Sequence, residues 1–315
     1  MGDFTKPGFI WLNGRFIRWA NAKIHVLSHA FLYGSGVFEG IRCYLAPEGP
    51  ALFRLQDHVE RLLYSAEVMK MGKALKFTRE EIEKACIETV ARNGLEECYL
   101  RPVLFYGSGK IGLSSTGIPV EAMVAAWPQE NYLGEGAAEN GIRLTVSRIA
   151  RNFQTKELAN AKVTGHYVQS MLAKTEAVEK GFDEALLLDR NGNVCEGAVE
   201  NIFIVRDGKL VTPPAQNALD GITRRSVIEI AMNEGIGTQE KFFGLEELLA
   251  ADEAFMTGTS AEITPIASVD SGAIGQEKPG EITKMLQEKF FAACRGKDGR
   301  YKKWLTPAKM PGRNA

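Results

Sequence analysis

The 315-residue sequence lacks any apolar run long enough to cross a membrane. Its N-terminus lacks the apolar stretch of a secretory signal, and Lys6 breaks the myristoylation pattern. It contains no internal repeat and no low-complexity segment. We therefore expect a soluble, cytoplasmic protein that has no membrane partner.

Cysteine is scarce. Cys43, Cys86, Cys98, Cys195 and Cys294 are scattered along the chain and odd in number. Because no pair has the spacing of metal ligands, we expect reduced thiols in the core and no metal site.

The sequence also lacks an excess of either charge sign, since 38 Lys and Arg residues face 39 Asp and Glu residues. Nucleic-acid binding usually needs a basic face, so we expect no nucleic-acid partner. Hydrophobic residues make up 45% of the chain and charged residues 24%, which is typical of a globular protein. The length indicates two domains of ordinary size or one large domain.

Strand-like and helix-like periodicities alternate irregularly along the first part of the chain. Asn13-Gly14 predicts a type I′ turn in a hairpin over 10–17. Apolar spacing predicts a helix over 54–71, capped by Gly72, and a second helix over 80–93. Strands are predicted over 98–106 and 121–127, with Tyr99 and Arg101 on one face. This mixture without strict alternation predicts an α+β fold.

Residues 128–140 are polar, contain glycine and lack periodicity, which is typical of a linker. We therefore expect a small α/β domain at 1–130, an interdomain linker at 131–140 and a larger domain at 141–315. Strands are predicted in that larger domain over 142–147, 184–188, 201–205, 210–212, 253–257 and 262–267, and helices over 166–180, 221–234, 244–250 and 281–294. The basic tail, 295–315, is expected to be loosely ordered.

The stretch from Cys195 to Arg224 is the most informative part of the chain. Glu196 and Glu200 flank a small Gly-Ala pair, and a β-branched and aromatic strand follows. Gly221 opens a helical pattern whose free N–H groups could hold an anion. Taken alone, the Glu-x-x-x-Glu spacing is more typical of a solvated face.

The complete pattern is more specific than its parts. The order Glu196, Ala198, Asn201, Phe203, Leu210-x-Thr212 and Leu219-x-Gly221-Ile222-x-Arg224 resembles the signature of class IV aminotransferases, the fold-type IV enzymes that use pyridoxal phosphate. In the first half, Tyr33-Gly-Ser-Gly-Val-Phe-Glu-Gly-Ile-Arg42, Tyr99-x-Arg101 and Tyr132 resemble branched-chain amino acid aminotransferases. The resemblance extends from Trp11 to about Phe291.

This resemblance implies a small α/β domain and a larger pseudo-barrel domain with pyridoxal 5'-phosphate between them. Family members are homodimers, or hexamers formed as trimers of dimers. A neighbouring chain contributes loop residues to the pocket, and Ile111 and Leu113 match those residues.

The cofactor residues are also implied by the resemblance. Lys162 matches the Schiff-base lysine and Glu196 the partner of the pyridine nitrogen, while Tyr167 matches the tyrosine that supports the ring hydroxyl. The phosphate contacts match Arg61, Ile222, Thr223 and Thr259. Without the family pattern, Lys162 is an ordinary surface lysine and Arg61 an exposed helix arginine in an ion pair.

The substrate residues form a larger set that the resemblance implies: Tyr33, Phe38, Gly40, Arg42, Tyr99, Arg101, Ile111, Leu113, Tyr132, Ser260 and Ala261. The turn at Ser260 and Ala261 would bind the α-carboxylate through backbone N–H groups. Arg101 would then read the distal carboxylate of glutamate or 2-oxoglutarate. The alternative is that Arg101 pairs with a nearby acid and only holds its strand.

The implied reaction is transamination of L-leucine, L-isoleucine and L-valine with 2-oxoglutarate, which yields branched-chain 2-oxo acids and L-glutamate. Three alternatives stay open: a D-amino acid or (R)-amine aminotransferase, an aminodeoxychorismate lyase, and a cofactor-binding protein without catalysis. The Tyr33–Arg42 motif disfavours the first, and the presence of Lys162 with Glu196 disfavours the last.

Overall fold

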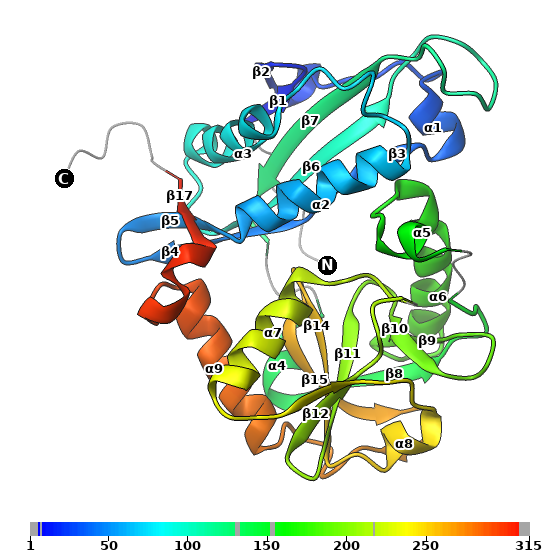
Figure 1. Cartoon of the computed structure of the whole chain (residues 1–315), viewed down its shortest axis with the longest axis vertical. Helices are drawn as coiled ribbons and strands as arrows, with labels where there is room; N and C mark the ends of the chain where they lie inside the picture. Colours follow the sequence, from blue (N-terminus) through cyan, green and yellow to red (C-terminus); the bar gives the residue numbers. More distant parts are fainter. Residues whose placement is uncertain (1–5, 7, 130–132, 152–154, 217, 309–315) are drawn as a thin grey trace. The chain divides into compact units, whose positions relative to one another are not determined.

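The computed structural model describes residues 6, 8–129, 133–151, 155–216 and 218–308 (Figure 1). Backbone contacts divide the chain into two compact units. The first unit is Met1–Glu130 with Ala161–His166 and Ala292–Ala315, and the second is Asn131–Asn160 with Tyr167–Phe291. Both contain helices and strands, so the predicted α+β class is confirmed.

The first unit contains an eight-stranded sheet among its described residues, in the order β17-β5-β4-β6-β7-β1-β2, with β3 paired to β6. Its strands are β1 (Phe9–Leu12), β2 (Arg15–Arg18), β3 (Gly36–Phe38), β4 (Ile41–Ala46), β5 (Gly49–Phe53), β6 (Cys98–Tyr106), β7 (Val120–Trp127) and β17 (Leu305–Pro307). Its helices are η1 (Trp19–Asn21), α1 (His29–Tyr33), α2 (Leu55–Val68), α3 (Arg79–Asn93), η2 (Thr164–His166) and η3 (Gly299–Trp304). Helices α2 and α3 pack against each other and against this sheet (Figure 1).

The first hairpin and the second long helix form as predicted. Asn13 and Gly14 join β1 to β2 with φ values of 49° and 88°, as a type I′ turn requires. Helix α3 ends at Gly94, which is left-handed. A capping box of Thr78 and Glu81 fixes the start of this helix.

The predicted end of α2 is wrong. Gly72 was expected as the cap, but α2 ends at Val68 and Lys70 takes the left-handed conformation, with φ of 60°. The N–H of Met71 donates to the carbonyl of Ala66 at 2.8 Å, and the Met71 side chain is fully buried. Burial of Met71 in the core accounts for a turn two residues earlier than the glycine indicates.

The prediction of a loosely ordered tail is wrong for residues 295–308. Strand β17 pairs with β5, and the Trp304 ring meets Phe53 edge-on with centroids 5.6 Å apart. Tyr301 is also buried. The aromatic side chains anchor a segment whose basic composition suggested disorder. Residues 309–315 lie outside the described residues.

The segment Ala161–His166 packs with the first unit. Val163 bridges to Val37, and the Thr164 hydroxyl donates to the carbonyl of Gly34 at 2.6 Å. The sequence assigns this segment and residues 292–315 to the larger domain, whereas spatial contacts group them with the first unit. A short helix, α4 (Ala137–Asn140), occupies part of the predicted linker.

The second unit contains a nine-stranded sheet among its described residues, in the order β10-β9-β8-β15-β14-β11-β12-β13, with β16 beside β15. Because β10 also pairs with β11, the strands β10, β9, β8, β15, β14 and β11 close into a ring, which is the expected pseudo-barrel. The strands are β8 (Ile142–Val146), β9 (Glu184–Leu188), β10 (Val194–Gly197), β11 (Asn201–Arg206), β12 (Lys209–Thr212), β13 (Thr238–Glu240), β14 (Glu253–Gly258), β15 (Glu262–Val269) and β16 (Gly272–Ala273). The remaining helices are α5 (Lys156–Asn160), α6 (Tyr167–Glu179), α7 (Ile222–Asn233), α8 (Leu245–Leu249) and α9 (Glu281–Cys294), the last of which ends in the first unit.

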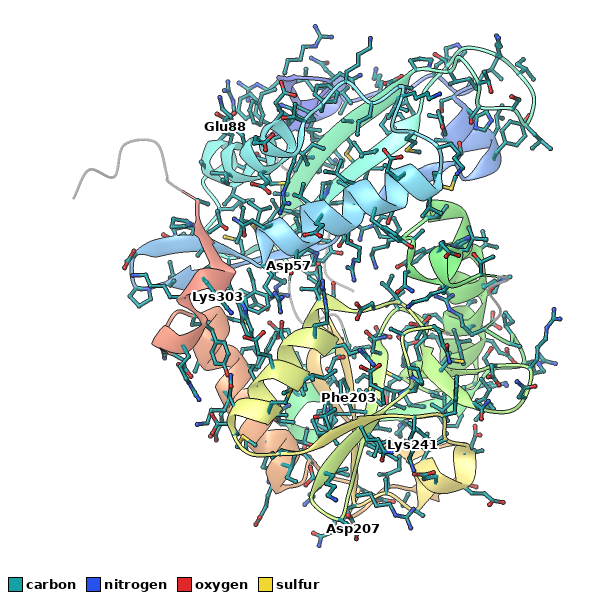
Figure 2. The ribbon with its side chains drawn as sticks, in the orientation of Figure 1. Asp57, Glu88, Phe203, Asp207, Lys241 and Lys303 are labelled. Carbon is teal, nitrogen blue, oxygen red and sulfur yellow. The ribbon has the colours of Figure 1, made fainter. Side chains whose placement is uncertain are left out.

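Apolar side chains of neighbouring strands fill the second unit. Phe203 of β11 stacks on Phe255 of β14, with ring centroids 5.1 Å apart and planes inclined by 9°. Figure 2 shows Phe203 within this unit and Asp207 at the tip of the β11–β12 hairpin. Asp207 and Gly208 have φ values of 50° and 70°, so they form the predicted turn.

Two general expectations can be compared with the structure. All five cysteines are buried and free, as the sequence predicts. Among the described residues, no helix is long and apolar enough to span a bilayer.

Candidate active site

Lys162 is held by its own backbone in the first unit. Its N–H donates to the Ser65 hydroxyl of α2 at 3.0 Å, and its carbonyl accepts from the N–H of Phe38 at 3.1 Å. The lysine lies in the short connection between α5, which ends at Asn160, and η2, which begins at Thr164. These contacts fix the backbone of Lys162, and with it the Cα–Cβ bond, against α2 and β3.

The Lys162 side chain lies over an aromatic ring, with Nζ 5.1 Å from the centroid of Phe38. Burial lowers the pKa of Lys162 to about 8, and the Arg61 charge acts in the same direction, while Glu39 opposes it. Lysine usually titrates near 10.4. Lys162 therefore carries a much larger neutral, nucleophilic fraction at physiological pH than an exposed lysine does.

Phe38, Tyr99 and Arg101 form one connected cluster. The Arg101 guanidinium lies 4.5 Å from the centroid of Phe38, and Nη2 donates to the Tyr99 hydroxyl at 3.0 Å. A Cβ at Gly40 would lie 1.9 Å from that hydroxyl, so Gly40 makes room for Tyr99. The predicted shared face of Tyr99 and Arg101 is thus present.

The structural alternative for Arg101 requires an acidic side chain beside it. Among the described residues no carboxylate forms an ion pair with Arg101, whose contacts are the Tyr99 hydroxyl and two aromatic faces. A guanidinium held by aromatic groups keeps its charge for an anionic ligand.

Arg61 has a partner that sequence reasoning missed. Its Nε and Nη2 donate to the two carboxylate oxygens of Glu39 at 2.6 and 2.9 Å. His58, one turn earlier on α2, contacts the same carboxylate through Nδ1 at 2.7 Å. The ion pair named as the alternative for Arg61 therefore exists, but it is buried instead of exposed. The position of Glu39 inside the Tyr33–Arg42 motif was the available signal.

The other expected residues of the first unit lie near its surface or along β4. Tyr33 ends α1 and is 40% exposed. Arg42 pairs in register with Tyr99, and its guanidinium lies 5.4 Å from the Tyr44 ring centroid. Ile111 and Leu113 are 74% and 80% exposed in the loop that joins β6 to β7.

In the second unit, Glu196 is buried on β10 and bound on both oxygens. Oε1 accepts from Arg151 Nε at 2.5 Å, and Oε2 accepts from the N–H of Leu219 at 3.2 Å. Arg151 is also buried. Sequence reasoning missed this arginine because no local motif connects residues so distant along the chain. Arg151 and the N–H of Leu219 thus provide hydrogen bonds to both oxygens of this buried side chain.

The N-terminus of α7 lies beside this carboxylate through Leu219. Ile222 and Thr223 are the first helical residues, and Gly221 is the N-cap, with no side-chain cap among the described residues. A Cβ at Gly221 would lie 2.0 Å from Asn201 Oδ1, so this position needs glycine. An uncapped helix start with its backbone donors is suited to a phosphate.

Glu200 is the second buried acid of this stretch. It is buried, and Oε2 accepts from the N–H of Val199 at 3.1 Å. Burial raises the pKa of Glu200 well above its usual range, and Glu184 adds to this rise while Lys174 opposes it. The folded protein therefore favours the protonated form of Glu200 more than water does.

The remaining expected residues occupy turns and helix starts of the second unit. Thr259, Ser260 and Ala261 form the turn that joins β14 to β15, as predicted, and the Thr264 hydroxyl donates to the Ala261 carbonyl at 2.6 Å. Tyr167 begins α6. Tyr132 lies outside the described residues.

The donor set fits pyridoxal phosphate. Such a cofactor needs a nucleophilic lysine, an acid for its pyridine nitrogen and an anion site for its phosphate. Lys162 has a lowered pKa, Glu196 is a stabilised carboxylate, and the start of α7 offers backbone donors.

Comparisons with known proteins agree with this fit. Residues 36–269 match the family model described as amino-transferase class IV. The chain is 42% identical to a branched-chain-amino-acid aminotransferase of Pseudomonas aeruginosa, over 98% of this chain and 100% of that protein. The solved T.th. branched-chain amino acid aminotransferase with pyridoxamine 5'-phosphate matches with a TM-score of 0.92 and 45% identity, covering 96% of this chain and 99% of that one.

A third similarity is to the solved branched-chain aminotransferase of Thermoproteus uzoniensis with norvaline. Its TM-score is 0.90 and its identity 43%, over 96% of this chain and 100% of that chain. Sequence and structure agree over nearly the whole length. The chain belongs to the class IV aminotransferase family.

Proposed function

We infer that this protein is a pyridoxal-phosphate-dependent branched-chain amino acid aminotransferase. It transfers the amino group of L-leucine, L-isoleucine or L-valine to 2-oxoglutarate and forms L-glutamate. The observation that carries this inference is Lys162, whose amine has a pKa of about 8 and lies over Phe38 beside the Arg101 cluster. The names of relatives that are 40% or more identical support the substrate class.

Lys162 is the proposed acid–base catalyst. When bound, pyridoxal phosphate supplies an electron sink that makes the Cα–H bond of the amino acid acidic. The neutral Lys162 amine would take this proton at Nζ and deliver it to the C4′ carbon of the cofactor within the same half-reaction. In the second half-reaction Lys162 would move a proton in the reverse direction, from C4′ to the Cα of the new amino acid. The lowered pKa suits both roles, because proton transfer is most effective when the pKa is near the working pH.

Two residues are proposed to set the electronic properties of the ring. Glu196 would contact the protonated pyridine nitrogen, and the bond from Arg151 holds this carboxyl group in place. Tyr167 supports the ring hydroxyl. The Arg151 guanidinium, with Nε 2.5 Å from Glu196 Oε1, places a positive charge beside this carboxyl group.

The phosphate is assigned to donors of two kinds. Arg61 supplies charge, whereas Ile222, Thr223 and Thr259 supply backbone and hydroxyl donors. The α7 start supports this assignment because helix N-termini favour anions through exposed N–H groups and the helix dipole.

The substrate assignment separates its two carboxylates. The Ser260–Ala261 turn would bind the α-carboxylate, and Arg101 with Tyr99 would read the distal carboxylate of glutamate or 2-oxoglutarate. Phe38 is the apolar wall that the described residues support best, and Gly40 preserves the space that Tyr99 occupies. Tyr33, Arg42 and Tyr132 complete the proposed substrate set.

We also propose that the protein works as a homodimer or a hexamer in the cytoplasm. Ile111 and Leu113 are apolar yet 74% and 80% exposed, as expected for loop residues that enter a neighbouring chain. Val26 and Phe31 are likewise exposed and apolar in the first unit, where Phe31 lines a hollow of about 460 Å³. Five free, buried thiols suit a reducing compartment.

The function is tested by incubating the holoenzyme with L-leucine, L-isoleucine or L-valine and 2-oxoglutarate. L-Glutamate is measured, with Lys162→Ala as the inactive control. Glutamate formation that depends on Lys162 supports the assignment. Absence of glutamate with all three amino acids, from a protein that holds its cofactor, contradicts it.

A further inference from the structure

Glu39 is a fully buried carboxylate that the reaction scheme leaves without a role. It follows Phe38 at the end of β3, and its side chain is 0% exposed. Both oxygens accept from Arg61, Oε1 from Nε at 2.6 Å and Oε2 from Nη2 at 2.9 Å. Two parallel bonds of this kind fix a guanidinium in its plane as well as in distance.

His58 completes the arrangement from the same helix as Arg61. Its Nδ1 lies 2.7 Å from Glu39 Oε2. Burial lowers the pKa of His58, although Glu39 opposes the shift, so the imidazole is neutral near pH 7. Because the carboxylate can only accept, Nδ1 carries the proton and donates it to Glu39.

Glu39 stays charged in this setting. Burial alone would raise the pKa of Glu39, but Arg61 and His58 outweigh burial and hold the pKa below its usual range. This buried anion accepts hydrogen bonds from Arg61, from His58 and, at 3.3 Å, from the N–H of Gly40. Removing a single partner from a buried ion pair of this kind is costly.

The same short segment is attached to the reactive lysine. The N–H of Phe38 donates to the Lys162 carbonyl at 3.1 Å, and the N–H of Glu39 donates to the carbonyl of Pro102 at 2.9 Å. Glu39 thus connects α2, which carries Arg61, to the backbone that holds Lys162.

We propose that Glu39 is a positioning residue that orients Arg61 toward the cofactor phosphate, and that His58 fixes Glu39 in turn. This proposal rests on the proposed function, because it takes Arg61 as a phosphate ligand. Without such a role, Glu39 would only reduce the positive charge that Arg61 offers to the phosphate.

Orientation and charge predict opposite effects of the isosteric change Glu39→Gln. If Glu39 only neutralises Arg61, its removal should tighten phosphate binding, since the guanidinium regains its full charge. If Glu39 orients Arg61, its removal should weaken phosphate binding, because an amide can accept from only one of the two donors.

The experiment compares two aldehydes on the apoenzyme: pyridoxal phosphate and pyridoxal, which lacks the phosphate. Both condense with the same amine, so the ratio of their dissociation constants cancels any change in the reactivity of Lys162. Glu39→Gln should raise the dissociation constant of pyridoxal phosphate about tenfold or more. It should change the dissociation constant of pyridoxal by less than about twofold. Glu60→Gln, an exposed neighbour of Arg61 on α2, is the matched control and should behave like the parent.

Arg61→Ala and the double variant separate this proposal from the phosphate assignment on which it rests. Arg61→Ala should lower the preference for pyridoxal phosphate, and adding Glu39→Gln should then change the ratio no further. If Arg61→Ala leaves the ratio unchanged, the phosphate role of Arg61 fails. If Arg61→Ala lowers the ratio but Glu39→Gln does not, only the positioning role fails.

Tighter binding of pyridoxal phosphate to Glu39→Gln overturns the proposal, and so does an equal loss for both aldehydes. Circular dichroism of each apoenzyme monitors folding. If Glu39→Gln does not fold, His58→Gln replaces it, and a parent-like ratio in that variant overturns the proposal. A lower ratio in folded His58→Gln supports it.

Discussion

Arg151 Nε lies 2.5 Å from Oε1 of Glu196, and both side chains are buried in the second unit. The guanidinium supplies both a positive charge and a hydrogen bond to this buried carboxyl group, so the group has a polar partner away from water. The contact leads to a catalytic prediction, because a neutral residue in place of Glu196 cannot stabilise a protonated pyridine nitrogen in the same way.

Glu196→Gln should retain the fold and bind pyridoxal phosphate but react slowly with amino acids. A hydrogen bond to a charged group contributes about 1.5–3 kcal/mol, so the half-reaction with L-leucine should slow at least about tenfold. Stopped-flow absorbance of the cofactor measures this rate. A variant that reacts as fast as the parent would show that Glu196 has no part in the chemistry.

Lys162 in the apoenzyme should become reactive at unusually low pH. Its pKa is lowered to about 8, so the neutral amine forms from that pH upward instead of near the usual 10.4. The rate of acylation of the Lys162 peptide, followed by mass spectrometry across pH, should reach half its maximum near pH 8. The exposed Lys84 provides an internal reference for the reagent. A midpoint above pH 10 contradicts the electrostatic account.

Arg101→Leu should separate the two substrates. If Arg101 binds the distal carboxylate, the KM for 2-oxoglutarate should rise far more than the KM for leucine. The loss of one charge-assisted contact should reduce the selectivity between the two substrates by about 1.5–3 kcal/mol. Steady-state kinetics with each substrate varied in turn gives both constants. Parallel losses for both substrates would mean that Arg101 only holds its strand.

Glu200 should make stability depend on pH in an identifiable way. Unfolded glutamates titrate near pH 4.3, whereas the raised pKa of Glu200 keeps its proton in the folded state above that pH. Between these two pKa values the folded state binds more protons, so stability falls as pH rises. Glu200→Gln should remove about 1.4 kcal/mol per pH unit of this slope in urea titrations. The exposed Glu179→Gln should keep the parental slope, and an unchanged slope in Glu200→Gln would contradict the assignment.

Local sequence patterns predicted much of the fold. The bounds of β6 and α9 match their predicted ranges, and both Asn-Gly and Asp-Gly hairpins form. These elements depend on periodicity and turn chemistry, which act between near neighbours. The end of α2 and the ordered tail were missed because burial of Met71 and of Trp304 is decided by distant parts of the chain.

The candidate site divides in the same way. Candidate residues inside a motif, such as Lys162 and Glu196, could be proposed from the sequence. The contact of Arg151 with Glu196 was missed, because it joins residues that are far apart along the chain. The contacts of Glu39 with Arg61 and His58 were missed for the same reason, although Glu39 lies inside the Tyr33–Arg42 motif. The charge state of a site residue depends on these partners, so the sequence could name the chemistry but could not account for its pKa values.

The most direct test of the whole account is the first half-reaction of the pyridoxal form. The enzyme is mixed separately with L-leucine, D-leucine and an (R)-amine, and the cofactor spectrum is recorded. We predict that L-leucine converts the cofactor to its pyridoxamine form and that 2-oxoglutarate restores the original spectrum, whereas Lys162→Ala shows neither change. Conversion by D-leucine or the (R)-amine, without conversion by L-leucine, would contradict the assignment of branched-chain L-amino acids as substrates.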